Sequence, residues 1–329
     1  MAKIIRWGIL GTGKIAHTFS TALKSLPQAE IVAVGSRTQA SAEKFADVFD
    51  IRQRYSSYEA LVNDADVDII YVSTPHTLHH ENSLLALNAG KHVLCEKPLG
   101  LNSRQVEEMI TTAKEKKRFF MEAMRMYFYP AIQKAKSLVE SGAIGTPRML
   151  QADFGFSATF DPQSRLFNPQ LGGGALLDIG IYPLAFAQLF FGKPMHLSGE
   201  AILGKTGVDE QITITAQYAG EETAVLCATL RANTESAAII SGSQGYLRIH
   251  REFWRPEKIS IISGRNLTEE LLEFPISGNG MEYEAQHVID CLTSGKTQSD
   301  MMSWQVSRDL MAMMDTLRAQ WGLRYPGEK

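Results

Sequence analysis

Two hydrophobic patterns alternate along the first third of the chain. Short apolar runs rich in Val and Ile predict buried β-strands, and the segments between them carry apolar residues at helical spacing. In the first of these segments, Ile15, Phe19 and Leu23 fall four residues apart on one helical face. The runs that predict strands are Ile4–Leu10, Ile31–Ser36, Asp68–Ser73, His92–Glu96 and Phe119–Met121. Such an alternation is typical of an α/β fold with a doubly wound parallel sheet.

The pattern changes after about residue 122. A helix is predicted over Ala131–Glu140, and the apolar runs beyond it have Gly and Asn turn signals between them instead of helices. These runs are Arg148–Phe156, Gln211–Tyr218, Ala224–Ala232, Ser236–Ser241 and Lys258–Ile262. We therefore expect two domains. Residues 1–122 form the parallel sheet, and residues 123–329 form an α/β domain with a large, mostly antiparallel open sheet and closing helices at Met281–Ser294 and Ser303–Trp321.

Composition and charge argue against several classes of protein. The 33 Lys and Arg nearly balance the 36 Asp and Glu, so neither nucleic acid nor a membrane surface is an expected partner. The apolar stretch Ile179–Gly192 is too short to span a bilayer and contains Pro183 and Gln188, so it predicts a buried helix. The apolar stretch Ile4–Leu10 leaves no room for a secretory signal ahead of it, so secretion is not expected, and the three cysteines lack disulfide or zinc spacing. We expect a cytoplasmic protein.

A glycine-rich turn follows the first predicted strand and opens the first predicted helix. It reads Gly11, Thr12, Gly13, Lys14, Ile15 and Ala16, which is the dinucleotide fingerprint with Ala in its third position. Glycines let the backbone approach a pyrophosphate, and the start of the helix offers N–H groups to that anion. The turn predicts a dinucleotide site, and a glycine-rich turn without a ligand is the alternative.

The residues after the second predicted strand indicate which dinucleotide binds. A site that prefers NAD usually has an acid there, which accepts hydrogen bonds from the ribose. This chain has Ser36, Arg37 and Thr38 instead. A guanidinium and two hydroxyls can bind a 2′-phosphate through charge-assisted hydrogen bonds. We therefore expect NADP in preference to NAD, with a solvated surface arginine as the alternative.

Further motifs lie at the ends of the third and fourth predicted strands, and others lie in the second domain. Together with the glycine turn, Ser73-Thr74-Pro75-His76-x-x-His79 and Glu96-Lys97-Pro98 resemble the glucose-fructose oxidoreductase, inositol dehydrogenase and MocA family, over essentially the whole chain. Within that family, three longer segments resemble the dimeric dihydrodiol dehydrogenases and the NADP-dependent D-xylose dehydrogenases. These segments are Gly172–Tyr182, Gly207–Asp209 and Gly278–Ala285.

The resemblance implies hydride transfer between nicotinamide and a CH–OH carbon, so the protein has one proton to manage. Asp178 and Tyr182 are four residues apart and share one face of a predicted helix. By resemblance, Tyr182 exchanges the proton with the substrate oxygen, Lys97 favours its phenolate, and Asp178 holds a substrate hydroxyl or the lysine. In the alternative, Lys97 is itself the acid and base and Tyr182 orients the substrate. A salt-bridged surface Lys97 and a core Tyr182 are the alternatives without catalysis.

The same resemblance assigns further residues to the surroundings of the ribose and nicotinamide. These are Tyr71, Ser73, Thr74, Pro75, His76, His79 and Glu96. We expect no metal at His76, His79 and His80, because no carboxylate or cysteine lies at a ligand spacing from them. Cys95 is interpreted as a small strand residue in preference to a reactive thiol.

One segment departs from the family pattern and bears on the substrate. Where the related dehydrogenases commonly read Glu-Ala-x-Trp-Thr-Arg-Phe, this chain reads Glu122-Ala123-Met124-Arg125-Met126-Tyr127-Phe128. Arg125 thus replaces an apolar wall with a cation, which favours a sugar or an acidic substrate over an aromatic diol. Phe154, Phe156 and Trp254 remain candidates for the pocket lining.

The resemblance also bears on assembly and on a non-enzymatic alternative. Family members cover the free face of the carboxyl-terminal sheet by pairing, so we expect a homodimer. Some members are regulators or scaffolds that sense NAD(P) without turnover. Because both Lys97 and Tyr182 are present, we expect an enzyme, a dehydrogenase or reductase acting on a sugar, polyol or cyclic diol.

Overall fold

The computed structural model describes residues 3–264 and 266–328 and divides into two compact units. The first unit comprises Met1–Arg125 and Ser277–Arg308, and the second comprises Met126–Ile276 and Asp309–Lys329. The chain therefore returns to the first unit late in its sequence. Helix α9 (Trp304–Trp321) begins in the first unit and ends in the second.

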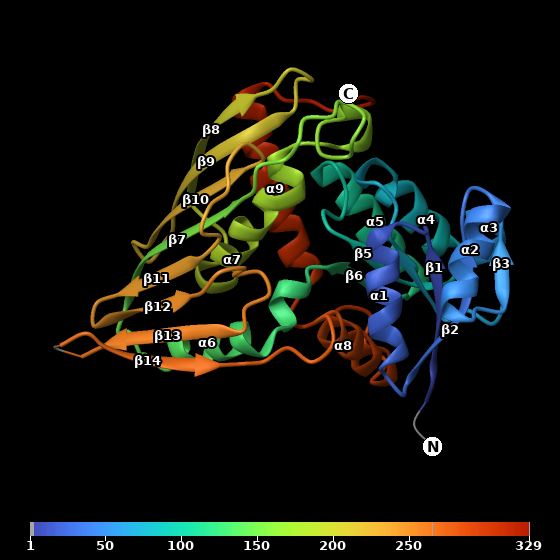
Figure 1. Cartoon of the computed structure of the whole chain (residues 1–329), viewed down its shortest axis with the longest axis horizontal. Helices are drawn as coiled ribbons and strands as arrows, with labels where there is room; N and C mark the ends of the chain where they lie inside the picture. The colour runs from blue at the N-terminus through green and yellow to red at the C-terminus, as the bar shows by residue number, and fades with distance from the viewer. Residues whose placement is uncertain (1–2, 265, 329) are drawn as a thin grey trace. The chain divides into compact units, whose positions relative to one another are not determined.

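A parallel sheet forms the centre of the first unit (Figure 1). Its strands follow the order β3-β2-β1-β4-β5-β6, and every neighbouring pair is parallel. They are β1 (Ile5–Leu10), β2 (Ala29–Gly35), β3 (Gln53–Tyr55), β4 (Ile69–Val72), β5 (His92–Glu96) and β6 (Phe120–Ala123). The strand order reverses between β1 and β4, where ligands bind in sheets of this type, beyond the carboxyl ends of the strands.

Helices of the first unit pack on this sheet or on one another. They are α1 (Lys14–Lys24), α2 (Gln39–Phe49), α3 (Tyr58–Val62), α4 (His79–Asn88), α5 (Ser103–Lys116) and α8 (Glu282–Thr293). Beneath α1, the rings of Phe19 and Tyr71 stack with centroids 3.9 Å apart, and Trp7 meets Phe19 edge to face. All three side chains are fully buried. Burying one such ring contributes about 1.5–3 kcal/mol, so α1 is fixed firmly against the sheet.

The second unit is built on a larger, mostly antiparallel sheet. Its strand order is β14-β13-β12-β11-β7-β10-β9-β8, and only the β7–β10 pair is parallel among the described strands. The strands are β7 (Pro147–Gly155), β8 (His196–Leu203), β9 (Asp209–Gln217), β10 (Thr223–Thr229), β11 (Ala238–Gly242), β12 (Gly245–Ile249), β13 (Lys258–Ser263) and β14 (Thr268–Glu273).

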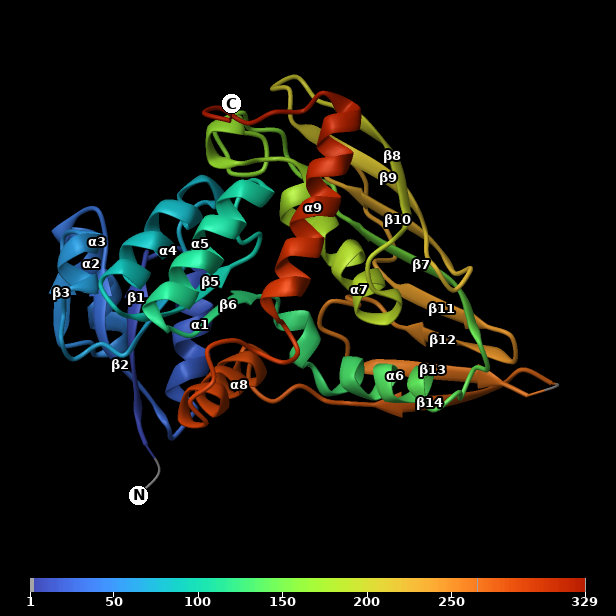
Figure 2. The same cartoon turned by 180° about the vertical axis from the view of Figure 1, so that it is seen from behind.

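Helices cover one face of this sheet. Figures 1 and 2 show α6 (Pro130–Glu140), α7 (Ile181–Phe191) and α9 on the same side. The helical stretch Pro169–Phe191 is long and apolar enough to cross a membrane, but 78% of its most apolar window is buried inside the protein. It is therefore a core helix of the second unit, as predicted from Ile179–Gly192.

The structure confirms the predicted fold class and adds elements that the hydrophobic pattern did not reveal. The strands predicted in the first third correspond to β1, β2, β4, β5 and β6. The additional elements are α2, β3, α3, α5, β8, β12 and β14. Most are short or largely exposed, so their apolar residues form no continuous run.

Candidate active site

The glycine turn has the backbone geometry that a dinucleotide requires. Gly11 has a φ of +103°, and a Cβ atom there would lie 3.1 Å from the Ser73 hydroxyl and 3.2 Å from the Ser73 carbonyl oxygen. A Cβ atom on Gly13 would meet nothing within 4 Å among the described residues. Gly13 is also the N-cap of α1, and no described side chain caps that helix. The residues present thus fit a pyrophosphate, which can approach Gly13 and the first N–H groups of α1.

Ser36, Arg37 and Thr38 follow β2 next to this turn. The Ser36 hydroxyl lies 3.4 Å from the Thr12 hydroxyl, which brings the two segments together. Arg37 is exposed. The Thr38 hydroxyl accepts a hydrogen bond from the Ser41 backbone N–H and caps α2, so its lone pairs are partly used within the protein. Arg37 and Ser36 are therefore the better placed of the three residues to bind an anion.

His79 joins the loop after β4 to the loop after β5. Its ring nitrogens lie 2.8 Å from the Thr74 carbonyl oxygen and 2.7 Å from the Pro98 carbonyl oxygen. Burial lowers the pKa of this histidine, with a smaller contribution in the same direction from the charge of Lys97. His79 therefore holds the segment after Lys97 in place. Its two ring nitrogens face backbone carbonyl oxygens and are not directed at a ligand.

Glu122 holds the same segment from β6. Its carboxylate accepts a hydrogen bond of 2.9 Å from the Leu99 N–H and one of 2.7 Å from the Ser307 hydroxyl at the start of α9. Burial raises the pKa of Glu122 to about 7 against the opposing effect of these bonds. The loop that carries Lys97 is thus fixed between two buried side chains of the first unit.

Tyr71, Glu96 and Arg125 belong to one buried electrostatic group. The Tyr71 hydroxyl donates to Glu96 at 2.5 Å, and Tyr71 itself is fully buried under Phe19. Burial raises the pKa of both Glu96 and Glu284, and the charge of Arg125 opposes that rise. Arg125 therefore lies near two acids of its own unit, Glu96 and Glu284. Tyr71 holds Glu96 in place from within the core.

The remaining candidates after β4 have local structural roles as well. Ser73 donates to the Leu10 carbonyl oxygen at 3.0 Å, Thr74 accepts from the Asn82 amide, and Pro75 precedes a 3-10 turn at His76–Leu78. His80 turns away to Glu108 on α5, with its Nε2 2.7 Å from the carboxylate. In the part of the chain that the structure describes, no group of His, Cys, Asp or Glu side chains could hold a metal ion.

In the second unit the structure brings Tyr182 together with the predicted aromatic residues. Phe154 and Trp254 stack with centroids 3.6 Å apart, and the Tyr182 ring lies 5.7 Å from Phe154 and 6.3 Å from Trp254. Phe156 extends the group at 6.3 Å from Phe154. Phe154 lies on β7, Phe156 directly after it, Tyr182 on α7 and Trp254 in the segment between β12 and β13, so their clustering follows from the fold.

Asp178 lies one turn before Tyr182, in a single turn of π-helix, Leu176–Gly180. The largely exposed Arg165 donates to the buried Asp178 carboxylate at 2.7 Å. The Arg165 guanidinium therefore holds the Asp178 carboxyl group in place one helical turn before Tyr182.

The start of this helical segment is clamped by residues from far along the chain. Asp209 accepts a hydrogen bond of 2.6 Å from the Leu176 N–H, and the Tyr325 hydroxyl donates to the Gly173 carbonyl oxygen at 2.6 Å. Gly174 has a φ of +122°, and a Cβ atom there would lie 2.2 Å from Asp209 Oδ1. The sequence motif has glycine at position 174 because Asp209 and Tyr325 leave no room for a side chain there.

Sequence reasoning missed four of these positioning residues. Arg165, Asp209 and Tyr325 act on the helix that carries Asp178 and Tyr182, and Glu122 acts on the loop that carries Lys97. Asp209 ends the segment Gly207–Asp209, and its sequence signal is an acid two residues after a glycine, at the start of an apolar strand. Arg165 and Tyr325 gave no sequence signal, because their partners are distant or lie in an irregular loop.

The fold and these sites define an oxidoreductase of the NAD(P)-binding type. Residues 5–124 match an oxidoreductase family with an NAD-binding Rossmann fold, and residues 132–248 match the GFO/IDH/MocA C-terminal domain. The chain belongs to the GFO/IDH/MocA family, as its motifs indicated. It is an NAD(P)-dependent oxidoreductase.

Similar proteins of known name span the whole chain. The chain is 38% identical over 331 residues to trans-1,2-dihydrobenzene-1,2-diol dehydrogenase of Xenopus tropicalis. The match covers 98% of this chain and 99% of that protein. The human protein of the same name is 35% identical over 339 residues, covering 99% of each. A 3-ketoreductase from Actinomadura kijaniata in complex with NADP and TDP-benzene has 28% identity and a TM-score of 0.87, covering 96% of this chain and 98% of that one. An aldose-aldose oxidoreductase from Caulobacter crescentus complexed with glycerol has 25% identity and a TM-score of 0.89, covering 98% and 99%.

Proposed function

We propose that this protein is an NADP-dependent dehydrogenase or reductase that acts on the CH–OH or carbonyl group of a sugar, polyol or cyclic diol. The observation that carries the proposal is the arrangement around Tyr182. The Tyr182 ring lies beside a stacked aromatic pair, one helical turn from a buried carboxyl group that accepts a hydrogen bond from an arginine. Aromatic rings bind the apolar face of a sugar or diol, and the carboxylate and phenol suit its hydroxyls.

The nicotinamide, when bound, accepts or returns the hydride of the carbinol carbon. The protein has to remove the hydroxyl proton as the C–H bond breaks. We propose Tyr182 as the group that takes this proton, with Lys97 stabilising the phenolate and Asp178 orienting a neighbouring substrate hydroxyl. In the second version of the proposal, Lys97 takes the proton and Tyr182 orients the substrate.

The preference for NADP rests on Arg37. It follows β2 on an exposed turn, at a position where a carboxylate would instead favour the ribose hydroxyls of NAD. The 3-ketoreductase similar to this chain was crystallised with NADP.

The nature of the substrate depends on Arg125 and the aromatic group. By their names, the dehydrogenase of Xenopus tropicalis acts on a cyclic diol and the oxidoreductase of Caulobacter crescentus acts on aldoses. We propose that Arg125 contributes charge-assisted hydrogen bonds to the substrate. This favours a sugar or an acidic substrate over an aromatic diol.

The test is turnover measured by the absorbance of reduced nicotinamide. Purified protein is offered NADP⁺ or NAD⁺ with a panel of aldoses, inositols and trans-dihydrodiols. We expect one class to be oxidised with NADP⁺, and Lys97→Met and Tyr182→Phe to lower kcat by roughly a hundredfold or more, as for other general acid–base groups. Lys116→Met, at the exposed end of α5, and Tyr246→Phe, on β12, are the matched controls and should retain full activity.

Cofactor binding is measured on the same variants by the fluorescence of NADPH. Full turnover by Lys97→Met would refute its proposed role. The pH profile of kcat is measured for both variants. The residue whose substitution removes the ionisation from that profile is the proton-transferring group. If wild-type protein binds NADPH tightly but turns over no member of a broad panel, the protein is a cofactor-sensing regulator and the proposed reaction is wrong.

A further inference from the structure

A second polar pocket lies at the opposite edge of the parallel sheet from the glycine turn. It has a volume of about 150 Å³ and is lined by Lys3, Ile5, Val67, Asp68, Gly90, Lys91, His92, Arg118 and Leu292. These residues stand at or just before the first residues of β1, β4, β5 and β6, or on α8. The pocket therefore opens at the amino ends of the strands, whereas the dinucleotide site lies beyond their carboxyl ends.

Arg118 is the least satisfied cation of this pocket. Its guanidinium makes no hydrogen bond or ion pair to any residue within 3–264 and 266–328, and its Nε atom is buried. A buried guanidinium nitrogen without a partner costs free energy, and a planar fork of N–H donors matches an oxyanion.

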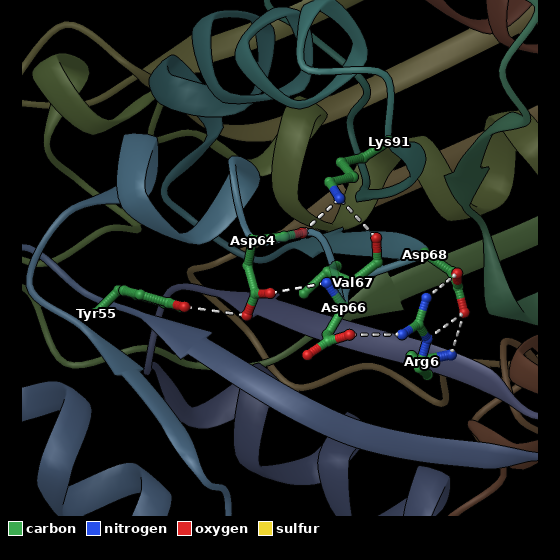
Figure 3. Close-up of polar contacts among 7 residues, drawn as sticks. All are labelled: Arg6, Tyr55, Asp64, Asp66, Val67, Asp68 and Lys91. Atoms are coloured by element: carbon green, nitrogen blue, oxygen red, sulfur yellow. Dashed lines mark hydrogen bonds and ion pairs between the residues drawn. The ribbon is translucent and has the colours of Figure 1, made fainter.

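Two lysines add to the charge. Lys91 donates to the carbonyl oxygens of Asp64, at 2.5 Å, and Val67, at 2.7 Å, which holds its ammonium group at the pocket wall (Figure 3). An ammonium group has three donors, so one remains for a ligand. Lys3 is exposed and has no ion pair within the described residues.

His92 contributes a hydrogen-bond donor to the pocket. Its Nδ1 accepts a hydrogen bond of 2.8 Å from the Phe119 backbone N–H, so in the neutral ring Nε2 carries the proton. Burial lowers the pKa of His92 to about 4, and the charges of Arg118 and Lys3 add to this effect against that of Asp68. The ring is thus a neutral N–H donor at physiological pH.

The acids nearby do not neutralise the pocket. Asp68 is the only carboxylate among its lining residues, and both of its oxygens accept hydrogen bonds from Arg6 (Figure 3). Asp66 also pairs with Arg6, and Asp64 accepts from the Tyr55 hydroxyl. The pocket is therefore lined by three cationic side chains, those of Lys3, Lys91 and Arg118, and by one carboxylate, which Arg6 already binds.

We propose that this pocket is a binding site for a small oxyanion of the phosphate class, held by Arg118, Lys91, Lys3 and the Nε2–H of His92. Sites for drug-sized molecules generally measure roughly 300–1,000 Å³, so a pocket of this size fits a phosphate group and excludes a dinucleotide. The anion is either free phosphate or the phosphate of a small metabolite. Its binding would relieve the repulsion among the cations at the start of the sheet.

Calorimetric titration tests the proposal on protein saturated with NADP⁺, so that the glycine turn is already occupied. Inorganic phosphate and glycerol 1-phosphate are titrated separately, with ionic strength held constant by chloride. We expect binding by wild-type protein and at least about tenfold weaker binding by Arg118→Gln, because charge-assisted bonds are lost. Arg52→Gln, which removes an exposed arginine elsewhere in the first unit, is the control and should bind as wild type does.

A second readout does not depend on the fold of a variant. The imidazole of His92 in wild-type protein is followed by NMR, and saturating phosphate should raise its pKa and shift its ring signals. Tighter binding of glycerol 1-phosphate than of phosphate would identify a metabolite as the source, and the reverse would identify the free anion. The proposal is overturned if neither anion binds, if Arg118→Gln and Arg52→Gln bind equally, or if His92 does not respond.

Discussion

The Asp209 carboxyl group is fully buried against the start of the helical segment that carries Tyr182. Burial raises its pKa from 3.8 to about 7, although the N–H groups of Leu176 and Ala175 and the charge of Arg318 oppose the rise. The folded protein therefore binds this proton more tightly than the unfolded chain does. The resulting contribution to stability is present below pH 3.8 and is lost as the pH rises from about 3.8 to about 7.

We predict that Asp209→Asn flattens the pH dependence of unfolding. Between pH 5 and 7.5 the free energy of unfolding of the wild-type protein should fall, by at most about 1.4 kcal/mol per pH unit for one such group. The variant should show a smaller fall, measured by urea denaturation at several pH values. Glu122, whose pKa burial also raises to about 7, should contribute similarly, so Glu122→Gln provides an independent comparison in the first unit. Identical slopes for wild type and Asp209→Asn would contradict the assignment.

Cofactor choice is also decided at the scale of one residue. We predict that Arg37→Gln raises the KM for NADP⁺ about tenfold or more and leaves the KM for NAD⁺ nearly unchanged, because only the 2′-phosphate loses a charge-assisted partner. Steady-state kinetics with both cofactors is the measurement. An equal rise for both would show that Arg37 acts on the shared part of the dinucleotide or on the fold.

At the scale of elements, the helical segment from Leu176 to Phe191 depends on a turn that tolerates no side chain. Gly173 and Gly174 approach Leu166, Asn168 and Asp209 so closely that an added Cβ atom would overlap them. The same close approach brings Arg165 to Asp178, since Gly174 donates to the Leu166 carbonyl oxygen at 2.9 Å. The position of Tyr182 and Asp178 is thus set by backbone packing.

We predict that Gly174→Ala destabilises the protein by about 2 kcal/mol or more and lowers activity, because it adds a clash to a strained φ. Gly142→Ala is the matched control. Gly142 also has a positive φ, +78°, but a Cβ atom there would meet nothing within 4 Å among the described residues. It should cost about 1 kcal/mol and leave kcat unchanged. Thermal unfolding and kinetics of both variants separate the clash from the backbone strain.

At the scale of the whole molecule, the uncovered face of the large sheet bears on assembly. On β10, the exposed Thr223 and Val225 alternate with the buried Ala224 and Leu226. Val225 pairs with Thr215 on β9 and with Gln151 on β7, so a flat row of small, mostly uncharged side chains crosses the sheet. We propose that this face pairs with its copy in a homodimer.

We predict that Val225→Arg shifts the protein to monomers in size-exclusion chromatography with light scattering, because two guanidinium groups would be desolvated at a symmetric interface. Val48→Arg is the control. Val48 is 60% exposed on α2 of the first unit, so the same substitution there should leave the oligomeric state unchanged. A monomeric wild-type protein, or a dimeric Val225→Arg variant, would refute the proposed interface.

The sequence by itself determined those features that depend on neighbours along the chain. The apolar periodicity revealed β1, α1 and β5, and the glycine turn and Glu96-Lys97-Pro98 indicated a dinucleotide enzyme, because strand burial, turn geometry and helix starts are local properties. The family, the fold class and the enzyme class followed from these motifs and are confirmed.

Contacts between distant segments were decided only by the tertiary structure. Residues 277–308 return to the first unit because Ser307 and Trp304 donate to Glu122 and to the Phe120 carbonyl oxygen. Asp209 and Tyr325 reach the segment Gly173–Leu176 from positions far along the chain, and Arg118 lies near Lys3 and Lys91 only where the strands begin. A sequence pattern carries no information on such pairs, since their energies arise from burial and from charges that the folded chain alone brings together.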